Sequence, residues 1–367
     1  MNIVFRVDAS RSMGSGHLMR CLTLAEALRT KGEHQIHFIC RSHPGDLREL
    51  LNDRHIQYSM LPEVKTQIDS PDTENSHAHW LGTSQAEDAR QTINALGSLV
   101  PDWLIVDHYG LDAEWEVPLR SKAKRIMVID DLADRRHDCD LLLDQTFLPH
   151  TETRYALLAP PDCRLLLGPS WALVRPEFAA LRGHSMLRRT LPRLSKILVC
   201  MGGSDPSNET MKVVEGLIQS NKRLAVDVIV GGAYTETAAL QKILCSMPAS
   251  RLHIQTDHMA QIMAEADFAI TSGGTITWEK CVLGLPGMTV ILDANQELIA
   301  QNMHSAEAQI TLGRGHSLSA RDYAECLDSV TPTMMTRLSR QAAAICDGQG
   351  AERVCEILLQ GEHRDAA

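Results

Sequence analysis

The segment RVDASRSMGSGHLMRCLTLAEAL, which begins at Arg6, places a histidine where a glycine-rich turn leads into a helical pattern. Histidine is the side chain best suited to take a proton from water near neutral pH, so His17 is the first candidate for a general base. A helix N-terminus disfavours imidazolium, and we therefore expect its position to keep His17 neutral. A role as helix cap is the alternative. The residues alone support both roles similarly, although Ser, Thr, Asp and Asn are the usual caps.

Three glycine-containing turns follow apolar runs and precede helical patterns, at residues 13–17, 201–205 and 271–275. Glycine permits positive φ and lets a ligand approach the backbone, and the N–H groups of a starting helix attract an anion. Tight packing in an α/β fold also explains any one of these turns, but two of them in one half of the chain favour a diphosphate site. The turn residues that we expect to contact ligand are Gly14, Gly16, Gly203, Ser204, Ser272, Gly273, Gly274 and Thr275.

These turns match neither of the usual nucleotide motifs. The chain contains no GxxxxGK[ST], and its first turn is not a GxGxxG followed by a ribose-binding acid at the expected distance. We therefore expect neither a Walker-type ATPase nor a nicotinamide enzyme. Glu279 lies about one turn into the helix after the third glycine turn, where a carboxylate can accept hydrogen bonds from both ribose hydroxyls. An acid favoured only by the helix dipole is the alternative.

Other polar residues lie at or near the ends of predicted strands. Asp8 ends the first strand, where it could orient His17 or order the glycine turn; a solvated strand-end acid is the alternative. Arg20 follows His17 by about one helical turn and could contact phosphate or sugar, although a surface charge is equally well supported. Asp107, His108 and Tyr109 end another strand and are expected to line the same site.

Aliphatic and β-branched runs alternate with helical patterns along the whole chain, which is typical of parallel βαβ units. A polar excursion at residues 66–85 interrupts the first half, and the pattern restarts after about residue 194. In the first half we predict strands at residues 2–7, 35–40, 102–107, 125–130, 140–144 and 163–169, and helices at 18–31, at 44–53 and from about 87. In the second half we predict five further strands, and a helical tail at 334–360.

The chain has 367 residues, which is more than one core usually holds. We predict an α/β protein of two Rossmann-like, doubly wound domains at residues 1–181 and 194–367, joined by a solvated basic linker. Ligands bind at the carboxyl ends of strands in such folds, so we expect the two domains to face each other across a cleft. The last helix is a candidate to pack back on the first domain.

Composition argues against several classes of protein. The net charge of −10 argues against a nucleic-acid partner. No apolar run approaches the ~20 residues of a membrane span, and the N-terminus lacks a signal-peptide pattern. The 10 cysteines include no CxxC pair, which is typical of reduced thiols and argues against zinc. We expect a cytoplasmic monomer that uses no metal or other cofactor and does not bind a membrane.

Several of these segments together resemble a known family. DHMAQIMAEADFAITSGGTITWEKCVLGLPGMTVILDANQ is similar to the UDP-binding region of two-domain GT-B proteins. The segment RVDASRSMGSGHLMRCLTLAEAL is more discriminating, together with VDHYGLD, GPSWALVRPEF and MGGSDPSN. It resembles the UDP-2,4-diacetamido-2,4,6-trideoxy-β-L-altropyranose hydrolases of pseudaminic acid biosynthesis, which serves flagellin glycosylation. The resemblance extends over residues 2–301 and implies a GT-B fold.

The resemblance also implies a reaction and its residues. The family cleaves the anomeric C–O bond of a UDP-sugar with inversion and without a metal, which yields UDP and free sugar. His17 matches the catalytic histidine and Glu279 the ribose-binding acid. Tyr109 is not among these matches; its position at a strand end makes it our candidate for sugar contact. The remaining matches are Gly273, Gly274 and Thr275 under the diphosphate, Met259 at the uracil, and Asn295 and Gln296 near the diphosphate and sugar.

Three other functions stay open on the sequence. A glycosyltransferase of the same fold would keep the UDP site and pass the sugar to an acceptor, and a sugar-nucleotide epimerase would act without net UDP release. A UDP-sugar-binding regulator would bind without turnover, although the histidine at the first turn argues against it.

Overall fold

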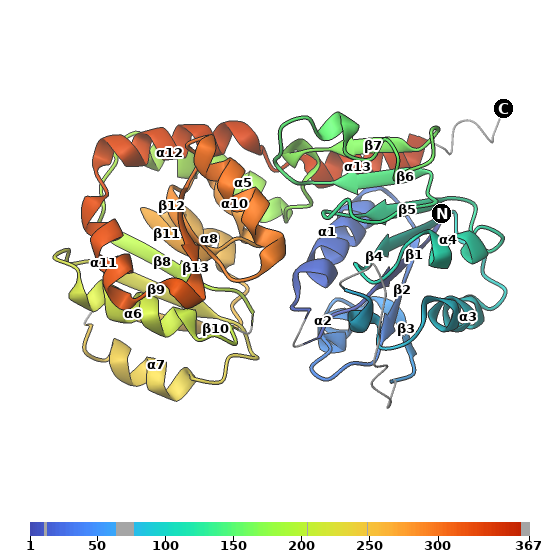
Figure 1. The fold of residues 1–367 in the computed structure, drawn as a ribbon, viewed down its shortest axis with the longest axis horizontal. Coiled ribbons are helices and arrows are strands. Elements are labelled where there is room, and N and C mark those ends of the chain that lie inside the picture. The colour runs from blue at the N-terminus through green and yellow to red at the C-terminus, as the bar shows by residue number, and fades with distance from the viewer. Residues whose placement is uncertain (11–12, 64–76, 204, 248, 361–367) are drawn as a thin grey trace. The chain divides into compact units, whose positions relative to one another are not determined.

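The computed structural model describes residues 1–10, 13–63, 77–203, 205–247 and 249–360 (Figure 1). The chain forms two compact units. The first unit comprises Met1–Leu173 and Gly350–Ala367, and the second comprises Val174–Gln349. Each unit contains one parallel β-sheet.

The sheet of the first unit has seven strands in the order β3-β2-β1-β4-β5-β6-β7. The order reverses between β1 and β4, which are neighbours, so their carboxyl ends form the switch point at which open α/β sheets bind ligands. The strands are β1 (Asn2–Val7), β2 (Gln35–Arg41), β3 (Gln57–Leu61), β4 (Trp103–Asp107), β5 (Ile126–Ile129), β6 (Leu141–Asp144) and β7 (Arg164–Leu167).

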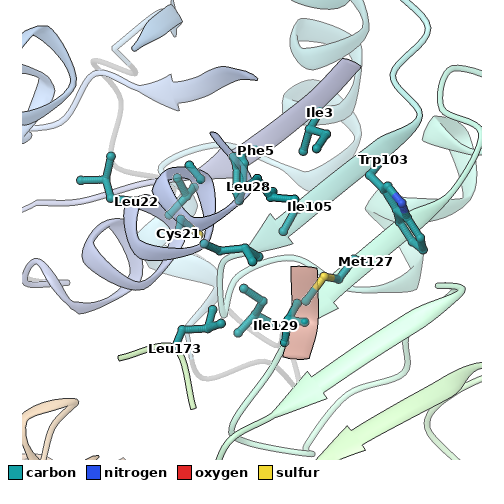
Figure 2. Close-up of a cluster of buried hydrophobic side chains, with 14 of the residues drawn as sticks. Ile3, Phe5, Cys21, Leu22, Leu28, Trp103, Ile105, Met127, Ile129 and Leu173 are labelled. Carbon is teal, nitrogen blue, oxygen red and sulfur yellow. The ribbon is translucent and has the colours of Figure 1, made fainter. Parts of the chain in front are cut away.

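Buried side chains cover both faces of this sheet. Alternation along β1 sends Ile3, Phe5 and Val7 into one core cluster and Val4 into another. Figure 2 shows the first cluster, in which Leu22 and Leu28 of α1 lie near residues of β1, β4 and β5. The helices of the unit are α1 (Gly16–Lys31), α2 (Arg48–Asp53), α3 (Gln85–Leu96), α4 (Ala113–Leu119) and α13 (Gly350–Leu359), with short 3₁₀ turns η1 (Ala78–Leu81), η2 (Thr151–Thr153) and η3 (Pro169–Trp171).

Helix α13 belongs to the first unit although it ends the described chain. Val354, Cys355 and Leu358 are fully buried in the same cluster as α1. The indole Nε1 of Trp103 donates a hydrogen bond of 3.1 Å to the carbonyl oxygen of Leu358. The red α13 beside the green β6 and β7 is visible in Figure 1.

The sheet of the second unit has six strands in the order β10-β9-β8-β11-β12-β13, with β8 and β11 as central neighbours. The strands are β8 (Lys196–Cys200), β9 (Ala225–Val230), β10 (Ser250–Ile254), β11 (Phe268–Ser272), β12 (Gly287–Ile291) and β13 (Ile310–Arg314). The helices are α5 (Pro176–Arg188), α6 (Glu209–Gln219), α7 (Thr237–Leu244), α8 (Met259–Glu265), α9 (Ile276–Leu283), α10 (Glu297–Ser305), α11 (Ala320–Ser329) and α12 (Pro332–Ile345), with η4 (Ala294–Gln296) and η5 (Gly315–Ser317).

The prediction of a solvated basic linker before residue 194 is wrong. Most of residues 182–193 belongs to helix α5, which Pro176 opens at its first position. The Arg182 guanidinium donates to the carbonyls of Val282, Ala343 and Cys346, so its charge holds helix ends together rather than facing water. The chain accordingly passes between the units at residues 173–174 and 349–350, not within the basic run.

No helix in the described part of the chain is long and apolar enough to span a bilayer.

Candidate active site

His17 makes a short contact with a carboxylate from the neighbouring strand. It is the second residue of α1, and its Nδ1 lies 2.6 Å from Oδ1 of Asp107, the last residue of β4. A carboxylate only accepts, so Nδ1 carries the proton and points it at Asp107. The Asp107 carboxylate is fully buried, and the side chain of His17 is 10% exposed. No hydrogen bond joins Nε2 of His17 to any residue that the structure describes.

Arg20 fixes the Asp107 carboxylate. Its Nε donates to Oδ2 at 2.6 Å and its Nη2 to Oδ1 at 2.7 Å, which is the two-pronged geometry of an arginine–carboxylate pair. Burial favours the neutral acid, but the Arg20 charge and the hydrogen bonds from Arg20 and His17 outweigh it and hold the pKa of Asp107 well below its ordinary value. Asp107 is therefore an anion at the Nδ1 edge of the histidine ring. Ligand contact and a surface charge were both considered for Arg20; the guanidinium is buried, which excludes the surface charge, and it binds Asp107 and Asp131.

Asp131 and Tyr109 complete this arrangement. Arg20 donates through Nη1 to Oδ2 of Asp131, and the Tyr109 hydroxyl donates to the same oxygen at 2.8 Å. The Tyr109 ring packs edge-on against His17, with ring centroids 4.4 Å apart. Burial and the nearby Asp131 charge raise the pKa of Tyr109 well above its ordinary value, so the phenol remains a donor. Tyr109 thus supports the histidine through its ring and Arg20 through Asp131.

Asp8 has other partners. It accepts from Arg6 at 2.6 and 2.9 Å and from the backbone N–H of Arg41 at 2.6 Å. This carboxylate joins a fully buried network of charges behind the sheet edge, and the described contacts include none between Asp8 and His17. The orienting role considered for Asp8 therefore falls to Asp107.

The first glycine turn is held by its own backbone. The N–H of Gly14 donates to the carbonyl of Ser10 at 2.9 Å, and Gly14 has a φ of +75°, which is the left-handed region that favours glycine. A Cβ at Gly14 would meet no atom of the described residues within 4 Å, so the positive φ is the reason for glycine that the structure shows. Gly16 is the first residue of α1, and Ser15 makes no side-chain cap there.

In the second unit the turn after β11 opens onto the start of α9. Gly274 and Thr275 are exposed, and Thr275 provides no side-chain cap for the helix. Ser272 and Gly273 are buried, and the Gly273 N–H donates to Oε1 of Gln296 at 3.2 Å. That same oxygen accepts from the N–H of Leu292 at 3.1 Å, so one amide side chain ties this turn to the end of β12.

The turn after β8 differs, because its helix already has an anion. Asp205 accepts from the backbone N–H groups of Glu209 and Thr210 at 2.9 and 2.7 Å, which occupies the start of α6. Gly203 is exposed and touches the next turn, since a Cβ at Gly231 would lie 2.1 Å from its carbonyl oxygen. Ser204 lies outside the described residues. Of the two turns, the one at α9 is better suited to an incoming phosphate.

Glu279 is paired within the second unit. Arg175, just before α5, donates through Nη2 to Oε1 of Glu279 at 2.9 Å and also lies 3.3 Å from Glu177. Burial raises the pKa of Glu279, and the Arg175 charge opposes that shift. Met259 is the first residue of α8 and is half-buried. Asn295 has a buried Oδ1 with no hydrogen-bond partner among the described residues.

Asp107 was expected to line the site, but its contact with His17 was not foreseen. Asp131, which bridges Arg20 and Tyr109, and Trp80 were not named as site residues. Trp80 stacks on Tyr109 at 5.8 Å and lies edge-on to His17 at 6.2 Å. The strand-end position of Asp107 was the available signal. Within the residues that the structure describes, no cluster of three or more His, Cys, Asp or Glu could hold a metal.

Comparisons with known proteins agree with the resemblance. No family model matches the chain. The UDP-2,4-diacetamido-2,4,6-trideoxy-beta-L-altropyranose hydrolase of Campylobacter jejuni is 25% identical over 302 residues, which cover 82% of this chain and 95% of that protein. The resemblance to that hydrolase is confirmed.

Two other curated proteins are similar. The spore coat polysaccharide biosynthesis protein SpsG of Bacillus subtilis is 23% identical over 364 residues, which cover 98% of each chain. The uncharacterized protein MJ1062 of Methanocaldococcus jannaschii is 24% identical over 300 residues, which cover 81% of this chain. The match spans only 56% of that longer protein.

Solved structures identify the fold. MurG of Acinetobacter baumannii superposes with a TM-score of 0.68 at 13% identity, over 98% of this chain and 99% of that one. UGT2 of Phytolacca americana, complexed with UDP-2-fluoro-glucose and pterostilbene, gives a TM-score of 0.68 at 14% identity, over 97% and 98%. The fold is GT-B, as predicted.

Proposed function

We propose that this protein hydrolyses UDP-2,4-diacetamido-2,4,6-trideoxy-β-L-altropyranose to UDP and 2,4-diacetamido-2,4,6-trideoxy-L-altrose, in pseudaminic acid biosynthesis. The observation that carries the proposal is the His17–Asp107 pair at the β1–β4 switch point, held by Arg20. A base prepared in this way suits activation of water, and the chain is similar along most of its length to a protein with this name.

In the proposed mechanism His17 is the general base. Because Nδ1 donates to Asp107, the lone pair of Nε2 accepts a proton from water as its oxygen attacks the anomeric carbon. The bond between that carbon and the diphosphate oxygen breaks, and its electron pair leaves with UDP. Attack on the face opposite the leaving group inverts the configuration. The Asp107 anion stabilises the imidazolium that forms. Nε2 of His17 then releases its proton to solvent, which restores the neutral base.

The proposal assigns the nucleotide to the second unit. The exposed backbone at Gly274 and Thr275, at the start of α9, would stabilise the diphosphate as it gains charge. Glu279 would accept hydrogen bonds from the ribose hydroxyls. Its carboxylate already accepts one from Arg175, so it must either keep that bond beside the ribose or give it up. The other residues assigned to the nucleotide-sugar are Gly203, Ser204, Met259, Ser272, Gly273, Asn295 and Gln296.

The decisive test is incubation of the protein with the UDP-sugar and no acceptor. We expect equal amounts of UDP and free sugar, an inverted first-formed anomer by NMR, and no loss of rate with a chelator. His17→Ala should fold, bind UDP normally and lose at least a hundredfold in kcat, because base catalysis commonly supplies about that much. A folded His17→Ala with full turnover would refute the assignment of the base.

A GT-B glycosyltransferase is the second candidate, because MurG and the plant UGT2 share this fold. It would release UDP from the same donor only when an acceptor is present. Turnover that requires an added acceptor, with no free sugar formed, would favour it over the hydrolase.

A further inference from the structure

Trp80 has a large aromatic side chain that is not part of the hydrophobic core clusters of the first unit. It lies on η1, where the next residue, Leu81, is buried in the core cluster on the α3 and α4 side of the sheet. Trp80 itself is only half-buried. The segment also lies close against the loop after β4, since a Cβ at Gly110 would come within 3.1 Å of the His77 carbonyl oxygen. The core and this loop therefore hold Trp80 in place at the surface of the unit.

Trp80 lies beside His17, the proposed base, and Tyr109, which packs against that histidine. Its ring stacks on Tyr109 with an interplanar angle of 24° and lies edge-on to His17 at 78°. The His77 ring contacts Trp80 at 4.7 Å and Tyr109 at 5.3 Å. Aromatic residues make up only 4% of the chain, so this grouping beside the base is not a general property of the surface.

Tyr109 is poorly placed to receive a sugar itself. Its side chain is 6% exposed, its hydroxyl donates to Asp131, and its ring contacts His17 and Trp80. Trp80 is thus the more accessible aromatic ring of the pair beside His17. An aromatic face is a good partner for the C–H face of a pyranose, because it removes apolar surface from water without needing a hydrogen bond.

From this geometry we infer that Trp80, supported by Tyr109 and His77, is the platform on which the sugar ring of the substrate packs. The inference rests on the proposed function and deepens it. A sugar that carries a methyl group in place of the hydroxymethyl group, and acetamido groups in place of two hydroxyls, offers more apolar area than glucose does. The platform would therefore favour deoxy and acetamido sugars and would hold the anomeric carbon near Nε2 of His17.

The test is a set of variants at this position and a matched control. Trp80→Ala should lower kcat/KM for the diacetamido trideoxy UDP-sugar on the order of tenfold, mostly through KM, whereas Trp80→Phe should retain most activity because a ring remains. Selectivity over UDP-N-acetylglucosamine, measured as the ratio of kcat/KM or of inhibition constants, should narrow in Trp80→Ala. Binding of UDP alone and the pH profile of kcat should not change.

Trp171→Phe is the control, since Trp171 is also half-buried in the first unit but packs with the core at η3 and α13. Should Trp80→Ala fail to fold, Trp80→Leu keeps apolar bulk without a ring and is judged by the same selectivity ratio. Unchanged kcat/KM and selectivity in a folded Trp80 variant would overturn the inference while leaving the hydrolase intact. A wild-type protein that releases no UDP from any of these sugars would overturn the proposed function and the platform with it.

Discussion

At the scale of single residues, the proposed chemistry depends on side chains that come from distant parts of the sequence. Asp107 follows His17 by 90 positions and meets it only because β4 pairs with β1. Histidine at a glycine turn can be recognised from local sequence, and His17 was. The carboxylate that orients it cannot, because Asp8 and Asp107 both end strands at the same sheet edge. Only the side-chain contacts separate them: Asp8 binds Arg6, and Asp107 binds His17.

Replacing Asp107 with Asn should lower the rate of the step that His17 catalyses more than it lowers the stability of the fold. The amide keeps the shape but can present N–H to Nδ1, which removes the reason for Nδ1 to carry the proton. We expect kcat to fall roughly a hundredfold or more, with UDP binding unchanged. Steady-state kinetics and titration with UDP measure the two effects. Asp267→Asn is the control, since Asp267 is a buried aspartate paired with Arg188 in the second unit, and it should keep kcat.

Replacing Glu279 with Gln should weaken nucleotide binding and leave the chemical step largely intact. A neutral amide accepts hydrogen bonds from ribose less strongly than a carboxylate does, so the Kd of UDP should rise on the order of tenfold. Calorimetry gives that Kd. Glu177→Gln alters the other carboxylate beside Arg175 at a more exposed position and should have little effect. Equal effects of the two variants would mean that Arg175, rather than the ribose, accounts for the loss.

At the scale of elements, the buried central strands were predictable, whereas two of the four edge strands were not. The apolar run at residues 2–7 matches β1 because both of its faces are buried. Strands β3 and β13 lie at sheet edges with half-exposed side chains, and neither was predicted. Arginines made α5 look like a linker, since sequence does not show which carbonyl groups a guanidinium will reach.

A buried histidine ties α4 to the loop before β6 and should make stability depend on pH. Burial opposes its charge, but Glu116 and Asp130 outweigh burial and raise the pKa of His137 to about 9. Its unfolded pKa is about 6.5, so this stabilisation is fully present below about pH 6.5 and is lost as pH rises through about 9. The shift corresponds to roughly 3 kcal/mol at most.

Urea unfolding at several pH values between 6 and 10 measures this effect. The free energy of unfolding of the wild type should decrease across that range by more than that of His137→Gln. The comparison matters because other groups titrate there, including Lys280, whose burial lowers its pKa to about 8. Identical pH slopes for the two proteins would contradict the charged His137.

At the scale of the whole molecule, two doubly wound halves were predictable from the restart of the strand–helix pattern. The sequence made the last helix only a candidate to pack on the first domain, because the apolar face of α13 would suit either core. The structure places Val354 and Leu358 in the core of the first unit, against α1. Helix α12, a few residues earlier, contributes Leu338 to the core of the second unit.

Charged substitutions on these two helices should therefore act on different units. Val354→Asp places an unpaired carboxylate in the first core and should destabilise that unit by roughly 3 kcal/mol or more. Leu338→Asp is the matched variant and should destabilise the second unit instead. Hydrogen exchange resolved by peptide reports each sheet separately. Loss of protection in β8 and β11 caused by Val354→Asp would contradict the placement of α13.

The return of α13 also has a consequence for biosynthesis. A ribosome makes residues 1–173 first, then the entire second unit, and only afterwards the helix that fills the core beside α1. The nascent first unit must therefore wait with an apolar surface uncovered for as long as roughly half of the protein takes to be translated. The second unit has no such delay, because it is continuous in sequence and can close as soon as it emerges. The unit made first is thus the one completed last, and it is the one that a cell's chaperones would have to shelter.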